Sequence, residues 1–343
     1  VCIYLGISLL LAYLNHVYIE KRFIDAYRYD QNLSIGLARS MGQTFVLSVF
    51  SIVVALYFIN PNYSYVRDLQ VKLAKPEVKD IDSKGLKELV VIGESHAQQF
   101  FPAFEELNKT YGISINNKTG SACFFSEDLY YVHGGKAERR CHKHLNSTIK
   151  WLMETSNEHR VVFVATRSLF YVSPNLISEA DFPVDGLIKG GELVPTSNNG
   201  ALHEFFKSLE ITLQKLNGAK VKVVFLAPIP ELKVPTYKCA FNPDKSECKT
   251  SRQRNIEYRS DFIVRLHEME QAYSGFRVWD PFDKICSTNY CSNIEGKSFI
   301  YRDDDHLSLD MARSLSGDLW ESIKDFYIVD QNRAPELAKH KTR

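Results

Sequence analysis

The alternation of short apolar runs with longer amphipathic stretches, beginning at residue 88, constrains the fold more than any other feature. Five apolar runs are each too short for a stable helix: 88–95, 112–116, 160–166, 220–227 and 276–280. Such runs are typical of strands buried on both faces of a parallel sheet. The amphipathic stretches between them predict helices: 96–110, 146–157, 201–217, 258–273 and 309–327. This alternation predicts a three-layer α/β fold with a parallel five-stranded sheet.

The composition predicts a large folded core and argues against a nucleic-acid partner. Of 343 residues, 45% are hydrophobic and 24% are charged, so most of the chain is expected to be ordered. The 42 Lys and Arg nearly balance the 41 Asp and Glu, giving a net charge of +1. Because a nucleic-acid-binding domain usually carries a broad basic surface, we expect no nucleic acid among the partners.

Two apolar segments precede the alternating region. Residues 1–19 and 41–59 carry no Asp, Glu, Lys or Arg. At about 1.5 Å per residue, each approaches the ~30 Å thickness of a bilayer core, which predicts two transmembrane helices. A buried core helix, or a signal sequence for the first segment, is the alternative. Residues 20–40 are rich in Lys and Arg, which favours the cytoplasm for this loop. Since the chain opens with Val1, we interpret it as the C-terminal part of a longer protein.

Six cysteines in the region after the second segment fall into pairs that are close in sequence. The predicted disulfides join Cys123 to Cys141, Cys239 to Cys248 and Cys286 to Cys291. Disulfides persist in oxidising compartments, so this region is expected outside the membrane.

A metal site at Cys141, His142 and His144, with His133, is the alternative for part of this set. The paired Cys or His spacings typical of zinc sites are missing, so we expect no metal.

The residues Gly93-Glu94-Ser95-His96 stand where the first strand gives way to the first helix. A serine there would lie in the crevice at the carboxyl ends of the strands, with its N–H at a helix N-terminus suited to an oxyanion. A helix N-cap serine would fit the same position without any chemistry.

The second motif is Asp303-Asp304-Asp305-His306, just before the last helix. A histidine that activates a serine needs a carboxylate on Nδ1, and the tight loop allows Asp303 to reach the His306 ring. This loop is expected near the end of the first strand, so His306 and Ser95 are predicted to meet. Asp304 and Asp305 are expected to be solvated or tied to the following helix, with Ser308 as its N-cap.

The segment 167–200 is expected to be a long irregular substrate loop. Phe170 and Tyr171 in this segment could stack on a sugar ring or could anchor the loop to the core.

These two motifs over residues 88–327 resemble the SGNH (GDSL-like) hydrolase superfamily, whose fold is flavodoxin-like. Two spans ahead of such a domain resemble the fused membrane proteins of acyltransferase family 3, as do the segments 13–22 and 227–231. The resemblance implies the following organisation: 1–19 the last core helix of the acyltransferase part, 20–40 a cytoplasmic loop, 41–59 an additional span, 60–87 a periplasmic linker, 88–327 the catalytic domain and 328–343 a flexible tail.

The resemblance also implies roles for individual residues. Ser95 would be the nucleophile, His306 the general base and acid, and Asp303 the residue that orients it. Gly120 would add a second N–H to that of Ser95 in the oxyanion hole. The family's asparagine after the third strand is missing, so Arg167 or Thr166 could supply the third donor. Arg167 could equally bind substrate or pair with a carboxylate, and His96 is expected to line the substrate pocket.

The function implied by the resemblance is O-acetyl transfer, through an acetyl-serine, to a sugar hydroxyl. The acceptor would be a bacterial surface polysaccharide such as the O-antigen of lipopolysaccharide, or its lipid-linked precursor. The chain would lie in the inner membrane with its catalytic domain in the periplasm. No cofactor is expected in this fragment itself. Acetyl-CoA would be the donor for the full-length protein, handled by the N-terminal membrane domain of the same chain. A periplasmic carbohydrate acetylesterase with the same triad, or a catalytically silent carbohydrate-binding domain, is the alternative.

Overall fold

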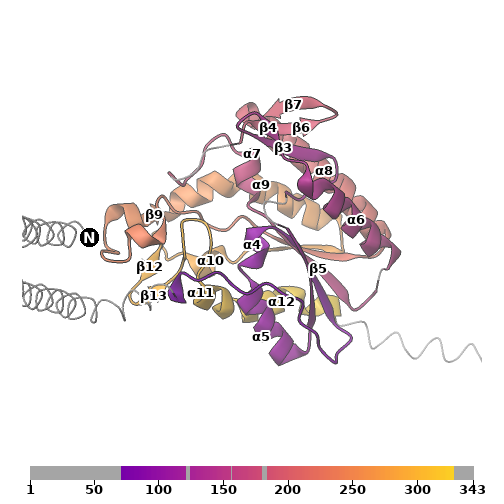
Figure 1. Ribbon diagram of the computed structural model, residues 1–343, viewed down its shortest axis with the longest axis horizontal. Coiled ribbons are helices and arrows are strands. Elements are labelled where there is room, and N and C mark those ends of the chain that lie inside the picture. Colours follow the sequence, from indigo (N-terminus) through magenta and orange to yellow (C-terminus); the bar gives the residue numbers. More distant parts are fainter. Residues whose placement is uncertain (1–70, 121–123, 156, 180–183, 328–343) are drawn as a thin grey trace, which may run out of the picture. The chain divides into compact units, whose positions relative to one another are not determined.

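The computed structural model describes residues 71–120, 124–155, 157–179 and 184–327 (Figure 1). The two predicted transmembrane segments, the loop between them and the predicted tail lie outside these ranges. Within the described residues, no helix is both long enough and apolar enough to cross a membrane.

A parallel five-stranded sheet forms the centre of the domain, as the sequence predicts. Its strands lie in the order β10-β8-β5-β1-β2, which is the flavodoxin-like order. Their bounds are β1 Glu88–Gly93, β2 Ser114–Thr119, β5 Arg160–Ala165, β8 Lys222–Leu226 and β10 Phe276–Trp279. In β1, Leu89 and Val91 face one hydrophobic cluster, and Val90 and Ile92 face the other. The strand is buried on both faces, which explains its continuous apolar run.

Helices cover both faces of this sheet and complete the three predicted layers (Figure 1). One face is covered by α5 (Phe101–Tyr111), α11 (Leu309–Ser314) and α12 (Ser316–Tyr327). The other is covered by α6 (Arg140–Glu154), α8 (Gly200–Gly218) and α9 (Arg252–Ala272). Because the five strands are parallel, their carboxyl ends lie at one edge of the sheet, and this is where ligands bind in such folds.

The helix predicted over 96–110 is divided into α4 (Ser95–Gln98) and α5. Pro102 lies in the first turn of α5, where its missing N–H breaks no intrahelical hydrogen bond. The break lets α4 stay a single turn at the end of β1. Gly112 ends α5 in the left-handed conformation with φ 63°, as its position predicts.

The prediction that residues 167–200 are irregular is wrong. This segment contains α7 (Ser168–Val172), β6 (Gly186–Lys189), β7 (Glu192–Pro195) and a 3-10 turn at Ser197–Asn199. Strands β6 and β7 join β3 (Leu129–His133) and β4 (Lys136–Ala137) in a separate antiparallel sheet of order β4-β3-β6-β7. The pairing of β6 with β3 joins distant parts of the chain, so the local pattern of residues does not reveal it.

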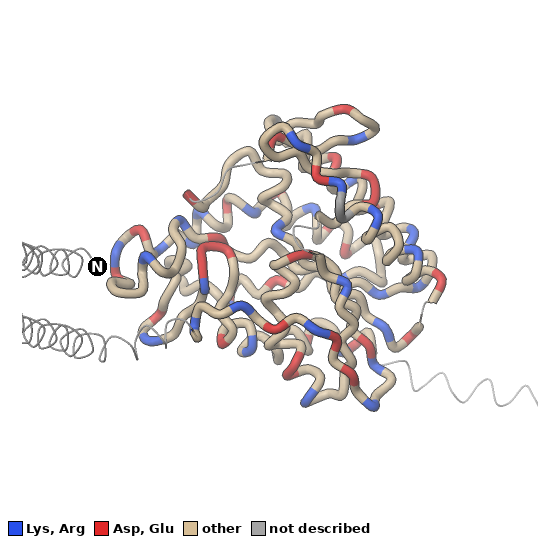
Figure 2. Tube along the Cα trace, in the orientation of Figure 1, with Lys and Arg blue, Asp and Glu red and all other residues tan. Residues whose placement is uncertain are grey.

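Shorter elements follow β8 and β10. They are η3 Thr236–Lys238, η4 Ser246–Cys248, β9 Lys249–Ser251, α10 Phe282–Ile285, β11 Tyr290–Ser292, β12 Ile294–Glu295 and β13 Ser298–Phe299. The predicted disulfides Cys239–Cys248 and Cys286–Cys291 in this region are confirmed. The predicted pair of Cys123 and Cys141 falls outside the described side chains. Acidic and basic residues are interspersed along the described part of the chain (Figure 2).

The described part of the predicted linker lies against the edge of the central sheet. The backbones of Ile81 and Ile115 in β2 exchange hydrogen bonds of 2.9 and 2.7 Å. Asp80 accepts a further bond of 2.6 Å from the N–H of Asn117. The polar segment before β1 is therefore fixed to the domain at this point.

Candidate active site

A glycine at the end of β1 determines where the predicted nucleophile lies. Gly93 has φ 136°, and a Cβ at this residue would lie 1.8 Å from the carbonyl oxygen of Ala165 in β5. Only glycine allows the two strand ends to approach so closely. Glu94 then takes the N-cap position of α4 and Ser95 becomes its first residue. Ser95 is thus not the N-cap, and its hydroxyl is used elsewhere.

The structure brings together Ser95, His306 and Asp303. Ser95 Oγ lies 2.7 Å from His306 Nε2, and His306 Nδ1 lies 3.0 Å from each carboxylate oxygen of Asp303. The backbone N–H of His306 also donates to Asp303 Oδ1 at 2.7 Å. A serine, a histidine and a carboxylate in this order form the proton-transfer chain of a serine nucleophile.

Contacts with three other parts of the chain fix the loop that carries His306. The N–H of Leu307 donates to Oε1 of Gln99, just after α4, at 2.6 Å. The hydroxyl of Thr236 donates to the carbonyl of Asp303 at 2.7 Å. The side chain of Ser308 caps α11, as predicted, by accepting from the N–H of Met311 at 3.1 Å. The serine and the histidine are therefore held by a common framework.

The expectation that Asp304 and Asp305 are solvated is wrong, because both are buried. Asp305 Oδ1 lies 2.8 Å from His306 Nδ1, so two carboxylates meet this ring nitrogen. Asp304 instead accepts a hydrogen bond from the hydroxyl of Ser178. The backbone of this loop is fixed at both ends, and the loop therefore turns each carboxylate towards a partner. The order of residues alone does not reveal these partners.

These carboxylates change the ionisation of the histidine. Burial lowers the pKa of His306, but the hydrogen bonds and charges of Asp303 and Asp305 outweigh it and raise this pKa to about 9. Burial would raise the pKa of Asp305, but His306 and Arg167 hold it well below its usual range. His306 is therefore protonated at neutral pH.

Glu94 provides a second acceptor for the hydroxyl of Ser95. Ser95 Oγ donates to Glu94 Oε2 at 2.7 Å, and the N–H of Arg167 donates to Glu94 Oε1 at 2.6 Å. Burial raises the pKa of Glu94, but His96, Ser95 and the Arg167 N–H together lower it to about 2. Sequence reasoning missed this contact. The available signal was a glutamate where the superfamily usually has an aspartate, whose side chain is shorter.

The prediction that Arg167 donates to the oxyanion is wrong, and the alternative of a carboxylate partner is confirmed. Its Nε and Nη2 lie 3.0 Å from the two carboxylate oxygens of Glu231, and its Nη1 lies 3.1 Å from Asp305 Oδ2. The guanidinium of Arg167 therefore forms ion pairs with two buried carboxylates. The hydroxyl of Thr166, the other candidate, pairs with that of Ser168 at 2.8 Å.

The prediction that Gly120 donates to the oxyanion is also wrong in this structure. Its N–H donates to the carbonyl of Gly93 at 2.9 Å and so continues the pairing of β2 with β1. The N–H of Ser95 lies at the first residue of α4, where a helix provides no acceptor, and remains the predicted oxyanion donor.

The prediction that His96 lines the substrate pocket is wrong, because its side chain is only 3% exposed. Its Nδ1 lies 3.1 Å from Glu94 and its Nε2 lies 3.8 Å from Asp305. Its ring centre is 4.7 Å from that of His306. His96 therefore packs against the residues that surround the triad, and His306 is the histidine that contacts Ser95.

The two aromatic residues of α7 differ in their surroundings. Tyr171 is buried, with its ring 4.8 Å from those of Phe124 and Tyr131. Of the two interpretations left open, anchoring of the segment to the core therefore holds for Tyr171. Phe170 is half-buried, and the guanidinium of Arg167 lies 5.0 Å from its ring centre.

Donor atoms of His96, Asp305 and His306 lie within 4.8 Å of one another and form a set that could hold a metal ion. Asp305 and His306 already bind each other in this set, so an ion would have to replace the contacts that orient the histidine. The fit to a metal is therefore poor.

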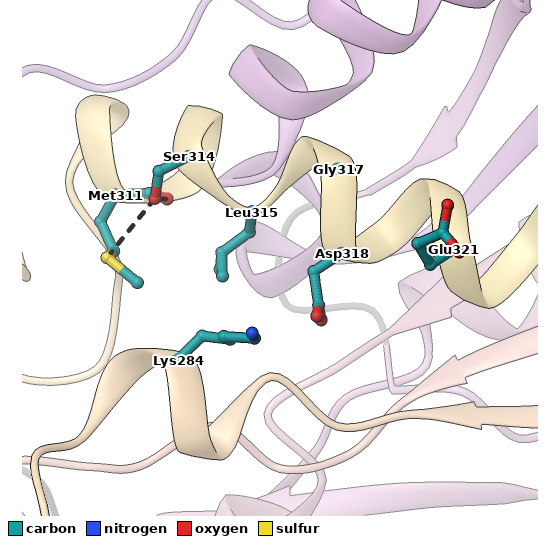
Figure 3. Close-up of a pocket in the computed structure, with 7 residues that line it drawn as sticks. All are labelled: Lys284, Met311, Ser314, Leu315, Gly317, Asp318 and Glu321. Carbon is teal, nitrogen blue, oxygen red and sulfur yellow. Dashed lines mark hydrogen bonds between the residues drawn. The ribbon is translucent and has the colours of Figure 1, made fainter.

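A separate hollow of about 450 Å³ lies between α10 and the two C-terminal helices (Figure 3). Lys284 reaches into it from α10, opposite Leu315 and Asp318. None of the triad residues lines it, so this hollow is distinct from the serine site.

The chain is similar to several solved structures. Three similar solved structures are the periplasmic domain of a lipopolysaccharide acetyltransferase from Salmonella ser. Paratyphi A, a GDSL-like lipase from Bacteroides thetaiotaomicron and an acetyl xylan esterase. Their respective identities are 16%, 11% and 14%, with TM-scores of 0.46, 0.38 and 0.39. The matches cover 71%, 77% and 69% of this chain and 85%, 98% and 99% of the other chains. A comparison with curated proteins finds no match. Residues 66–321 match the family described as the SGNH domain fused to AT3 domains, and the chain belongs to this family.

Proposed function

We propose that this protein is an O-acetyltransferase that carries an acetyl group on Ser95 and passes it to a sugar hydroxyl of a bacterial surface polysaccharide, such as O-antigen, or its lipid-linked precursor. The observation that carries the proposal is the chain Ser95–His306–Asp303, with contacts of 2.7 and 3.0 Å. A serine held in this way is an activated nucleophile for acyl transfer.

The first half of the reaction forms the acetyl-serine. Neutral His306 takes the proton of Ser95 through Nε2 as Oγ attacks the acetyl carbon of the donor. The N–H of Ser95 donates to the oxygen that gains negative charge. His306 then gives the proton to the leaving group, and the bond from the acetyl carbon to that group breaks.

The second half transfers the acetyl group. His306 takes the proton of an acceptor hydroxyl, whose oxygen attacks the acetyl carbon, and the proton returns to Oγ as Ser95 leaves. Water in place of the sugar would give an esterase, so the acceptor and the exclusion of water decide the outcome.

Membership of a family described as the SGNH domain fused to AT3 domains supports transfer to a sugar rather than free hydrolysis. The disulfides Cys239–Cys248 and Cys286–Cys291 fit an oxidising compartment such as the periplasm. We further propose that acetyl-CoA is the original donor and that the membrane domain delivers its acetyl group to Ser95. This chain alone is then expected to be inactive with acetyl-CoA.

The test uses the full 343-residue chain with p-nitrophenyl acetate as a substitute donor and de-acetylated O-antigen as acceptor. We expect an acetyl-serine at Ser95 and acetylated polysaccharide in amounts that exceed the free acetate. Ser95→Ala should abolish both products. Acetate as the sole product, at any acceptor concentration, would make the protein an esterase. An unmodified Ser95 would contradict the proposal altogether.

A further inference from the structure

We propose that Asp305 is a second positioning carboxylate for His306, held in place by the ion pair of Arg167 with Glu231, so that the histidine remains oriented when Asp303 is lost. This inference rests on the proposed function, because it assumes that His306 is the base for Ser95.

The first observation is the distance from each carboxylate to the ring. Asp305 Oδ1 lies 2.8 Å from His306 Nδ1, whereas the oxygens of Asp303 lie 3.0 Å away. Nδ1 carries one hydrogen, which hydrogen-bonds to Asp303 in this structure. Asp305 contacts the same nitrogen as an ion pair and is the nearest carboxylate to accept that hydrogen once Asp303 is replaced. Both carboxylates therefore favour a ring that carries a hydrogen on Nδ1 and turns Nε2 towards Ser95.

The second observation is burial. The side chain of Asp305 is 10% exposed, whereas that of Asp303 is 35% exposed. A carboxylate acts more strongly on a neighbouring imidazole when water does not screen it, so Asp305 is the better shielded partner.

The third observation is the support behind Asp305. Its other oxygen, Oδ2, lies 3.1 Å from Nη1 of Arg167, whose remaining nitrogens bind both oxygens of Glu231. Glu231 is fixed in turn, because its N–H donates to Oδ1 of Asn255 at 3.0 Å. A bidentate pair of this kind fixes direction as well as charge. Arg167 and Glu231 thus hold the carboxylate of Asp305 in its orientation towards His306.

Other charged groups also face this histidine. Nε of the buried Arg302 lies 3.2 Å from Asp303 Oδ2 and donates a hydrogen bond to that carboxylate. His96 of α4 lies beside the ring and contacts Asp305, and Glu94 faces His96 from the end of β1. Arg302 competes with His306 for Asp303, so the second carboxylate gives the ring a partner that Arg302 does not touch.

The test measures how fast a fluorophosphonate labels Ser95 in the full chain, as a function of pH. The variants are Asp303→Asn, Asp305→Asn and the double variant. Asp310→Asn, an exposed aspartate on α11, is the matched control. A triad with one orienting carboxylate loses about 10⁴-fold in rate when that group becomes an amide. Here the labelling rate of each single variant is expected to fall only about 10-fold, because the other carboxylate still orients the ring. The double variant should lose about 10⁴-fold, far more than the product of the single losses.

The pH profile separates orientation from a purely structural effect. Each single substitution should move the ascending limb of the labelling rate to lower pH, and the double variant should approach the ordinary histidine pKa of about 6.5. Thermal melting of each variant checks that it is folded. The Asp303→Asn variant tests the inference without changing Asp305. This test therefore remains valid even if Asp305→Asn fails to fold.

Two results have distinct meanings. If Asp303→Asn alone is as slow as His306→Ala, the inference is overturned and the proposed function stands. If the wild-type chain labels no faster than Ser95→Ala, the proposed function fails and the inference falls with it.

Discussion

Ser95 Oγ lies 2.7 Å from Glu94 Oε2, the same distance that separates it from His306 Nε2. With His306 protonated, its Nε2 donates to Ser95 Oγ, and the hydroxyl proton of Ser95 is donated to Glu94. His306 must therefore release its Nε2 proton to solvent, and the hydroxyl of Ser95 must turn towards Nε2, before Ser95 attacks. Ser95 is thus activated only when His306 becomes neutral.

Replacing Glu94 with Gln removes the charged acceptor and keeps the shape of the side chain. A hydrogen bond to a charged group contributes about 1.5–3 kcal/mol, and weakening it in the resting state is expected to speed fluorophosphonate labelling of Ser95 about 10-fold. The measurement is the second-order labelling rate at constant pH. Glu88→Gln, at the opposite end of β1, is the control and should leave the rate unchanged. A slower Glu94→Gln variant would show that this carboxylate supports the nucleophile.

The reactivity of Ser95 should rise with pH up to about 9. The pKa of His306 is raised to about 9, and only the neutral ring accepts the serine proton. The initial rate of p-nitrophenyl acetate hydrolysis, corrected for the uncatalysed rate at each pH, gives this profile. A midpoint near the ordinary value of about 6.5 would contradict the contacts at Nδ1.

The free energy of unfolding should vary with pH in both directions. The folded pKa of Glu94 is lowered from 4.5 to about 2, so its contribution is complete above pH 4.5 and is lost as the pH falls towards 2. The folded pKa of His306 is raised from 6.5 to about 9, so its contribution is complete below pH 6.5 and is lost as the pH rises through 9. Both contributions are therefore complete between these limits. Urea unfolding from pH 3 to pH 10 should give the highest midpoint there. The Glu94→Gln variant should lose less stability than the wild type on the acid side.

Removing the Cys239–Cys248 disulfide by a double serine substitution should destabilise the domain by about 2–3 kcal/mol, because a covalent loop of this length restricts the unfolded chain. The sequence separation of this pair is 9, whereas that of Cys286–Cys291 is 5. The second double substitution is the control and should give the smaller loss in urea unfolding. Equal losses would contradict the loop-length argument.

Gly93→Ala should destabilise the domain by about 3 kcal/mol or more and abolish labelling of Ser95, because the new Cβ would collide with the carbonyl oxygen of Ala165. Gly190→Ala is the matched control. This glycine has φ 60°, but nothing lies within 4 Å of its added Cβ. Its free energy of unfolding should therefore fall by only roughly 1 kcal/mol, the cost of placing an alanine in the left-handed conformation. Equal melting temperatures for the two variants would contradict the predicted collision.

The central sheet and the meeting of Ser95 with His306 were predictable because their signals are local. Each buried strand is an apolar run, and the loop between Asp303 and His306 is only two residues long. The contacts of Arg167 with Glu231 join residues that are 64 positions apart. Such pairs depend on how loops from different strands meet, and neither residue carries a local sign of its partner. The same reason explains why the sequence does not predict β6 and β7, or the contact of Asp305 with His306.

The hydrogen bond from Leu307 to Gln99 ties the loop of the histidine to the residue that follows α4. The serine and its base are thus parts of one clamp, although they lie 211 positions apart in the chain. The small antiparallel sheet contributes no residue to this clamp. Mutation can therefore reshape that sheet while the spacing of nucleophile and base stays constant.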